Sequence, residues 1–287
     1  MNIQWYPGHM TKARRMMQED IKLIDIVIEL VDARVPLSSK NPDIDTLAKG
    51  KARLILLNKA DLADAEQTRA WEAYFRGRGY YVLALDSRTA KGVKSVTNVI
   101  LEACKEKIER DRRRGIINRP VRAMIVGIPN VGKSTFINTL AGKACTKTGN
   151  KPGVTKGKQW IRLNKDVELL DTPGILWPKF EDQSVGQKLA MIGSIKDDIL
   201  DIRELAWLLV GLLTEKYPGI LKKRYNIDEN SDRMNIIEQI ADIRNCRLKG
   251  NEPDIDKAAR LLLEDFRGAK LGAITLDFPD MQEASEN

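Results

Sequence analysis

The strongest constraint on the fold of this chain is a glycine-rich motif, G-x-x-x-x-G-K-S, at residues 127–134. An apolar run, Arg122 to Val126, comes directly before the motif, and a helical pattern, Thr135 to Leu140, follows it. A strand, a glycine-rich turn and a helix in this order are typical of a P-loop, in which backbone N–H groups at the helix N-terminus surround phosphate groups. The motif therefore predicts an α/β domain that binds a nucleotide.

The phosphate side of the expected site also includes a second motif, Asp171-Thr172-Pro173-Gly174, at the end of another apolar run. We expect Lys133 to reach the β and γ phosphates and assist catalysis, and Ser134 and Asp171 to hold Mg²⁺. The N–H group of Gly174 is placed to contact the γ phosphate. The expected contacts within the P-loop are Asn130, Val131, Gly132, Lys133, Ser134 and Thr135.

Apolar runs that alternate with helical patterns predict a doubly wound α/β domain with a mainly parallel sheet, and beyond about residue 180 amphipathic patterns predict a small all-α domain. The expected strands are Asp25–Val31, Ala52–Leu57, Tyr80–Leu85, Arg122–Val126 and Val167–Leu170. The expected division is a nucleotide domain with a basic N-terminal helix over 1–180, a linker over 181–200, a helical domain over 201–276 and an acidic tail over 277–287. Residues 280–287 of this tail are expected to be loose.

The base of the nucleotide is predicted by Asn58-Lys59-Ala60-Asp61, which ends the second expected strand. A carboxylate accepts hydrogen bonds from both N1–H and the exocyclic amino group of guanine, which adenine cannot reproduce, so Asp61 would select guanine. Asn58, Lys59 and Ala60 would hold the ring. Asp86-Ser87-Arg88, at the end of the third strand, would supply backbone donors to the guanine carbonyl.

Together these motifs resemble the signature set of GTPases, but the guanine motifs here precede the phosphate motifs. Over about residues 3–277, the chain resembles the ribosome biogenesis GTPases of the circularly permuted YlqF/YawG family. Further matches are Trp5-Tyr6-Pro7-Gly8-His9-Met10, Asp32-Ala33-Arg34-Val35-Pro36, Asp265-Phe266-Arg267-Gly268 and Lys270-Leu271-Gly272. Arg88 stands where the motif more often has Ala, which matters little if backbone donors bind the base, and Asp277 stands where we expect Glu.

The residue that positions the attacking water is not evident from these motifs. The motif Asp171 to Gly174 corresponds to the third motif of GTPases. Many GTPases place a glutamine directly after its glycine, whereas this chain has Ile175. His9, the single histidine, is the candidate, and its alternative role is to pack within its turn. Thr155 is expected to cover Mg²⁺ and the γ phosphate, with Thr146 and Thr148 as alternatives. Asn130 occupies the position that coordinates the ion in potassium-activated GTPases, so K⁺ activation is a hypothesis.

Charge points to a polyanionic partner. The chain carries 48 Lys and Arg against 40 Asp and Glu, with basic clusters over Lys105–Arg122 and Lys143–Lys158. Such fields attract phosphate backbones, although they can also be a solvated surface. The resemblance implies a role in assembly of the large ribosomal subunit, with its rRNA as the main contact and the helical domain over 201–276 as an RNA-binding element. No DNA partner is expected. The RNA-contact candidates are Lys12, Arg14, Arg15, Arg112, Arg113, Arg114, Lys222, Lys223, Arg224, Arg267 and Lys270.

The expected location of this chain is the cytoplasm. Its longest apolar stretch, Leu205 to Leu213, is far shorter than the roughly 20 residues of a membrane-spanning helix, so no membrane partner is expected. The N-terminal residues carry polar and basic side chains where a secretion signal has an apolar core. The three cysteines are far apart and are expected to be reduced thiols.

Three alternative functions stay open. The chain could be a GTP-gated switch for a protein partner, with its basic clusters merely solvated. It could be a nucleotide-gated RNA placeholder with negligible hydrolysis, which Ile175 motivates. An ATPase would leave Asn58 to Asp61 without a purpose.

The segment after Gly174 leads into residues 201–276, so nucleotide state is expected to set the orientation of the helical domain.

Overall fold

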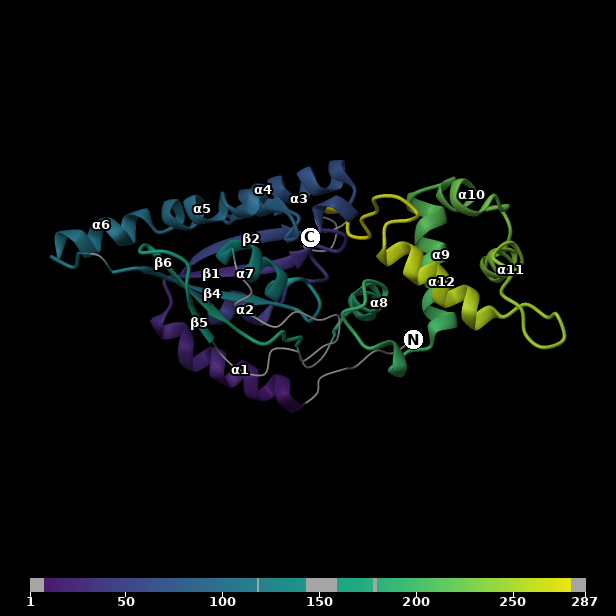
Figure 1. Cartoon of the computed structure of the whole chain (residues 1–287), viewed down its shortest axis with the longest axis horizontal. Coiled ribbons are helices and arrows are strands. Elements are labelled where there is room, and N and C mark those ends of the chain that lie inside the picture. Colours follow the sequence, from purple (N-terminus) through teal and green to yellow (C-terminus); the bar gives the residue numbers. More distant parts are fainter. Residues whose placement is uncertain (1–7, 118, 143–158, 178–179, 280–287) are drawn as a thin grey trace.

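The computed structural model describes residues 8–117, 119–142, 159–177 and 180–279 (Figure 1). A six-stranded sheet with the order β3-β2-β1-β4-β6-β5 forms the centre of its N-terminal part. Neighbouring strands pair in parallel, except that β5 is antiparallel to β6. The strands are β1 (Ile26–Asp32), β2 (Ala52–Asn58), β3 (Tyr81–Leu85), β4 (Val121–Gly127), β5 (Gln159–Arg162) and β6 (Val167–Asp171).

The sheet is buried because helices cover both of its faces. Every residue of β1 is buried, including the charged Glu29 and Asp32. Figure 1 shows α3 and α5 along one side of the sheet and α1 along the other. The helices and short turns of this part are α1 (Gly8–Asp20), η1 (Ile21–Leu23), α2 (Asp43–Leu47), η2 (Ala60–Leu62), α3 (Ala65–Gly77), α4 (Ala90–Val93), α5 (Val96–Ala103), α6 (Lys105–Arg113) and α7 (Lys133–Ala141). The expected doubly wound, mainly parallel α/β fold is confirmed.

The C-terminal part consists of helices, as expected. Helix α9 packs against α11 and α12 through side chains that are fully buried, among them Leu205, Leu209 and Leu213. The aspartates before α9, α11 and α12 accept hydrogen bonds from backbone N–H groups of the first turn, which stabilises the start of each helix. The elements are α8 (Gln183–Met191), η3 (Asp197–Ile199), α9 (Ile202–Lys216), α10 (Ile220–Tyr225), α11 (Arg233–Ile243) and α12 (Ile255–Arg267).

Among the described residues, none of the helices combines the length and apolar character needed to span a bilayer. Cys104 and Cys246 are buried free thiols, and burial raises the pKa of Cys104 to about 12. Cys145 lies outside the described residues.

Asp277, the first residue of the expected acidic tail, is held within the fold. The Asp277 carboxylate accepts hydrogen bonds from the N–H of Ser38 at 2.8 Å, the Ser38 hydroxyl at 2.9 Å and Lys188 Nζ at 2.8 Å. Trp71 Nε1 donates to the Asp277 carbonyl oxygen at 2.9 Å. The N–H of Leu276 donates to a carbonyl oxygen of the loop after β1. The chain therefore returns from α12 onto the sheet domain, because Asp277 finds buried donors there.

Candidate nucleotide-binding site

The carboxyl ends of the parallel strands bring the separate motifs to one edge of the sheet. β2 ends at Asn58, β4 ends at Gly127 of the P-loop, and β6 ends at Asp171. Ligands of open α/β sheets bind outside this edge. Asn58 and Val131 are 73 positions apart in the chain, yet they are joined by a hydrogen bond. The reversed motif order therefore still produces one site.

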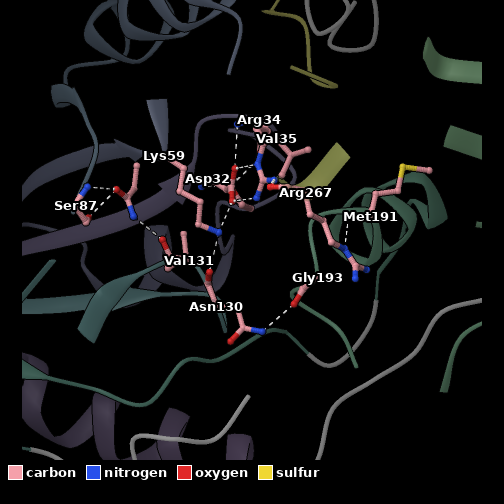
Figure 2. Close-up of polar contacts among 12 residues, drawn as sticks. Asp32, Arg34, Val35, Lys59, Ser87, Asn130, Val131, Met191, Gly193 and Arg267 are labelled. Carbon is pink, nitrogen blue, oxygen red and sulfur yellow. Dashed lines mark hydrogen bonds and ion pairs between the residues drawn. The ribbon is translucent and has the colours of Figure 1, made fainter. Parts of the chain in front are cut away.

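Asn58 joins three of the expected motifs. Its side chain donates from Nδ2 to the Val131 carbonyl oxygen at 2.7 Å, and its Oδ1 accepts from the N–H of Ser87 at 3.0 Å and from Ser87 Oγ at 2.7 Å (Figure 2). Gly132 has a φ of +102°, and a Cβ there would lie 2.5 Å from Asn58 Nδ2, so only glycine fits. Asn58 thus positions the loops around the base rather than acting on one of them alone.

Lys59 connects the base motif, Asn58 to Asp61, to the P-loop and to a buried ion pair. Its Nζ donates to the Asn130 carbonyl oxygen at 2.9 Å and lies 3.0 Å from Asp32 Oδ2. Arg34 binds both oxygens of Asp32, with Nε at 2.8 Å and Nη2 at 2.7 Å. Burial alone would raise the pKa of Asp32, but Arg34 and Lys59 together hold it well below its ordinary value. Asp32 is therefore a buried anion that fixes the amine of Lys59.

This polar network extends into the helical part of the chain. Arg34 Nη1 donates to the Arg267 carbonyl oxygen at 3.2 Å, and Arg267 Nε donates to the Met191 carbonyl oxygen at 2.9 Å (Figure 2). Asn130 Nδ2 donates to the Gly193 carbonyl oxygen at 2.8 Å. The P-loop therefore contacts the segment after α8 directly, whereas Lys59 is linked to the end of α8 through Asp32, Arg34 and Arg267.

The loop after β3, expected to supply backbone donors to guanine, makes hydrogen bonds within the chain. The N–H of Ser87 donates to Asn58 Oδ1, and the N–H of Arg88 donates to Asp86 Oδ1 at 2.9 Å, so two of the three backbone N–H groups of the motif have partners here. The Arg88 guanidinium hydrogen-bonds to Asp61 Oδ2 and to both oxygens of Asp86. The expectation for Arg88 considered only backbone donors and overlooked this side-chain contact with Asp61.

The P-loop holds a buried amine. Lys133 is the first residue of α7, and its Nζ donates to the carbonyl oxygens of Gly127 and Ile128, each at 3.0 Å. Burial lowers the pKa of Lys133 to about 8, and the charge of Asp171 opposes that shift. A Cβ on Gly174 would lie 2.9 Å from Lys133 Nζ, so glycine lets the third motif approach the amine closely. Such an arrangement places a cation where phosphate oxygens would bind.

The donor set fits Mg²⁺. Asp171 is 1% exposed, and neither of its carboxylate oxygens has a hydrogen-bond partner among the residues that the structure describes. Burial raises the pKa of Asp171 to about 6, while Lys133 opposes the rise. An unpartnered buried carboxylate at the phosphate edge suits a cation, because the cation would satisfy its lone pairs. Asp171 and Ser134 are the described residues that would hold Mg²⁺.

Asp171→Asn is expected to raise the melting temperature of the protein measured without Mg²⁺ or nucleotide above pH 7, and to abolish the stabilisation by Mg²⁺ with GTP. The neutral amide removes the cost of a buried charge, about 3 kcal/mol for a shift of this size. Thermal unfolding with and without Mg²⁺ and GTP measures both effects.

The pH dependence of this difference has a defined sign. The folded-state pKa of Asp171 lies above its ordinary 3.8, so the unionised carboxyl favours folding below about pH 4, and that advantage is lost as pH rises through about 6. The wild-type protein should therefore lose stability relative to Asp171→Asn over this window. Asp166→Asn, an exposed residue just before the same strand, is the control and should change neither quantity. Equal stabilisation of Asp171→Asn by Mg²⁺ with GTP would contradict the assignment.

Two expected catalytic residues are only partly placed. His9 is the second residue of α1, but its side chain lies outside the description. Thr155 and its alternatives Thr146 and Thr148 lie outside the described residues. The lysine cluster from Lys143 to Lys158 lies outside them as well. Ala60 follows Lys59 as the first residue of η2, and Thr135 lies in the first turn of α7.

The basic candidates divide into exposed side chains and side chains engaged within the fold. Arg14 pairs with Asp43 at 2.9 Å, and Arg224 and Lys270 both pair with Asp265, at 2.8 and 3.2 Å. Arg267 is bound to Asp197 and to backbone carbonyl oxygens at the end of α8, so its guanidinium has a structural role. The exposed candidates are Lys12, Arg15, Arg112, Arg113, Arg114, Lys222, Lys223 and Lys270.

Sequence reasoning left the roles of Asp32 and Arg34 open and missed Gly193. The signal for the first two was a carboxylate at the end of a largely apolar strand, on the edge where the other motifs end. Gly193 carries no local signal, because its role is to offer a carbonyl oxygen to Asn130.

Comparisons with known proteins agree with this geometry. A family model described as "50S ribosome-binding GTPase" matches residues 122–246, which begin at the P-loop strand. Ribosome biogenesis GTPase A of Priestia megaterium is 50% identical over 99% of both chains, and that of Thermotoga maritima is 33% identical over 97% of this chain and 95% of its own.

Solved structures agree as well. The GNP-bound structure of YlqF from T. maritima is 29% identical, with a TM-score of 0.65 over 94% of this chain and 99% of that chain. A GDP-bound YlqF structure gives a TM-score of 0.66 at 28% identity, over 93% of this chain and all of that one. The reversed motifs on a P-loop sheet and the identity along the whole chain lead to one conclusion: the chain belongs to the ribosome biogenesis GTPase A family.

Proposed function

We propose that this GTPase hydrolyses GTP in contact with the large ribosomal subunit, late in the assembly of that subunit, and that it binds rRNA through exposed basic side chains. Its membership of a ribosome biogenesis GTPase family establishes the coarser role. The observation that carries the finer proposal is the position of the exposed charge, and the matching family model, described as ribosome-binding, supports it.

The exposed basic residues lie far apart on the molecule. Arg112 and Arg113 lie at the end of α6, and Lys222 and Lys223 lie in α10. Figure 1 shows α6 at one end of the long axis and α10 toward the other, with α1 between them. A short RNA would reach only one of these sites, whereas a ribosomal particle presents phosphate groups over the whole span. The spacing therefore favours a large, rigid polyanion.

The phosphate side supplies the groups for hydrolysis. Lys133 would neutralise the charge that develops on the β and γ phosphates, and the N–H of Gly174 would bind the γ phosphate. Mg²⁺, held by Asp171 and Ser134, would supply further neutralisation of the triphosphate. The chemistry at this edge is therefore charge stabilisation and positioning, which is what phosphoryl transfer requires.

The group that orients water must come from elsewhere. Ile175 is 2% exposed, and its N–H donates to the Gly127 carbonyl oxygen, so this residue belongs to the core. The N–H of Leu176 contacts Met10 Sδ at 3.5 Å, which brings the start of α1 beside the third motif. His9 precedes Met10 directly and so remains our candidate, with the bound subunit as the agent that orders it.

The test is the GTP turnover rate of wild type and His9→Ala, with purified large subunits, with small subunits or alone. We expect large subunits, but not small subunits, to accelerate GTP turnover by wild type. In the presence of large subunits, His9→Ala should turn over GTP at least about tenfold more slowly than wild type, while it keeps its GTP affinity. Repeating the assay with Na⁺ in place of K⁺ tests whether Asn130 takes part in K⁺ activation.

The other outcomes identify the alternatives. Normal GTP binding without acceleration by large subunits, and with RNA binding insensitive to salt, would favour a switch for a protein partner. Subunit binding that depends on GTP without multiple turnovers would favour a nucleotide-gated RNA placeholder. Unchanged turnover of His9→Ala would remove His9 from the mechanism.

A further inference from the structure

Arg88 bridges two carboxylates on the base side of the site. Its Nη2 donates to Asp61 Oδ2 and lies 3.1 Å from Asp86 Oδ2, while its Nε lies 3.0 and 3.2 Å from the two Asp86 oxygens. The side chain is 64% exposed, and that of Asp61 is 32% exposed. The guanidinium therefore sits on the outer side of Asp61, where a base entering from solvent would meet it.

Arg88 and guanine present the same chemistry to Asp61. The N1–H and the C2 amino group of guanine belong to a planar unit with a central carbon bonded to nitrogens, and an arginine side chain ends in a similar planar unit. Both offer parallel N–H donors to a carboxylate. One carboxylate cannot pair fully with both at the same time.

We propose that Arg88 competes with guanine for Asp61 and thereby lowers the affinity for guanine nucleotides and slows their entry. The inference rests on the proposed role of Asp61 in selecting the base. Asp86 offers the Arg88 guanidinium a second carboxylate partner, so the guanidinium stays paired when it leaves Asp61. The N–H of Arg88 also donates to Asp86, so a base that recruits this N–H must rearrange the same residue.

The size of the effect follows from exposure. Partly exposed ion pairs are weak, so Arg88 adjusts the affinity rather than blocking the site. Only the fraction of molecules in which Asp61 is released binds the base, and the apparent dissociation constant rises in proportion. Losing a positive charge near a nucleotide, or losing a cation that stacks on the base, would weaken binding. If Arg88 helped to bind the nucleotide in either of these two ways, its removal would weaken binding. If Arg88 competes with guanine, its removal tightens binding.

The experiment measures binding of fluorescently labelled GDP to the full-length protein by stopped flow, for wild type, Arg88→Ala and Arg88→Gln. We expect about three- to fivefold tighter binding for both variants, with the gain in the association rate constant. Arg203→Ala is the matched control, because Arg203 is a similarly exposed arginine that forms a two-pronged pair with Asp256 in the helical domain. It should leave GDP binding unchanged. Unchanged or weaker GDP binding by both Arg88 variants would overturn the proposal.

Asp61→Ala separates this proposal from the assignment of the base site. Loss of GDP affinity in Asp61→Ala supports the base site, whatever Arg88 does. In Asp61→Ala/Arg88→Ala, the second change should no longer tighten binding, since the contested carboxylate is gone. Tightening that persists in the double variant would overturn the competition, and normal GDP affinity in Asp61→Ala would overturn the base site itself.

Discussion

Arg34→Ala is expected to lower the free energy of unfolding by about 3–5 kcal/mol, which is the usual cost of removing one partner of a buried ion pair. Arg34 is 2% exposed and Asp32 is 0% exposed, so the change leaves a buried anion with Lys59 as its remaining charged partner. It also removes the contact with the Arg267 carbonyl oxygen. Urea-induced unfolding measures the loss.

Two controls separate the buried pair from loss of an arginine in general. Arg203→Ala breaks the exposed pair with Asp256 and should cost less than about 1 kcal/mol. Asp32→Asn/Arg34→Met removes both charges together and should recover part of the stability lost in Arg34→Ala. If Arg34→Ala costs no more than Arg203→Ala, the network does not stabilise the fold.

Asp61→Asn is expected to lower GTP affinity by at least about 100-fold, because the amide cannot accept both donors of guanine and leaves polar groups unpaired. Xanthine carries a carbonyl group where guanine carries its amino group. The Asn side chain offers an N–H to that carbonyl, so the same variant should bind xanthosine triphosphate. Since Asp61 is partly exposed in a loop, the fold should tolerate the change.

The arrangement of the sheet could be predicted because its strands carry strong local signals. Apolar runs over residues 122–126 and 167–170 end directly at polar motifs, and parallel strands place such ends at one edge. The edge strand β5 was missed. Its four residues include Gln159 and Arg162, and they follow a stretch rich in lysine and glycine, so no apolar pattern marks it.

The contacts that connect the two parts of the chain could not be predicted, because they join residues far apart in sequence. Arg34 and Arg267 are separated by 233 positions, and Ser38 and Asp277 by 239. Local sequence suggested an acidic tail from Asp277 and an RNA contact at Arg267. It could not show that each side chain has fixed partners within the fold.

The base-side loop shows the same limit in one motif. The residue types at Asp61 and Ser87 predicted a guanine site, and the structure brings their loops together through Asn58. That Arg88 would reach Asp61, 27 positions away, depends on how the two loops fold against each other. A sequence motif identifies the groups that can recognise a base, but their competitors appear only in three dimensions.

We propose that motifs in reversed order form one site that selects guanine and hydrolyses its triphosphate. Turnover of GTP and of xanthosine triphosphate by wild type and Asp61→Asn, measured with large ribosomal subunits present, tests this site. We expect wild type to turn over GTP but not xanthosine triphosphate, and Asp61→Asn to turn over xanthosine triphosphate in place of GTP. Undiminished GTP turnover by Asp61→Asn, without any gain on xanthosine triphosphate, would contradict it.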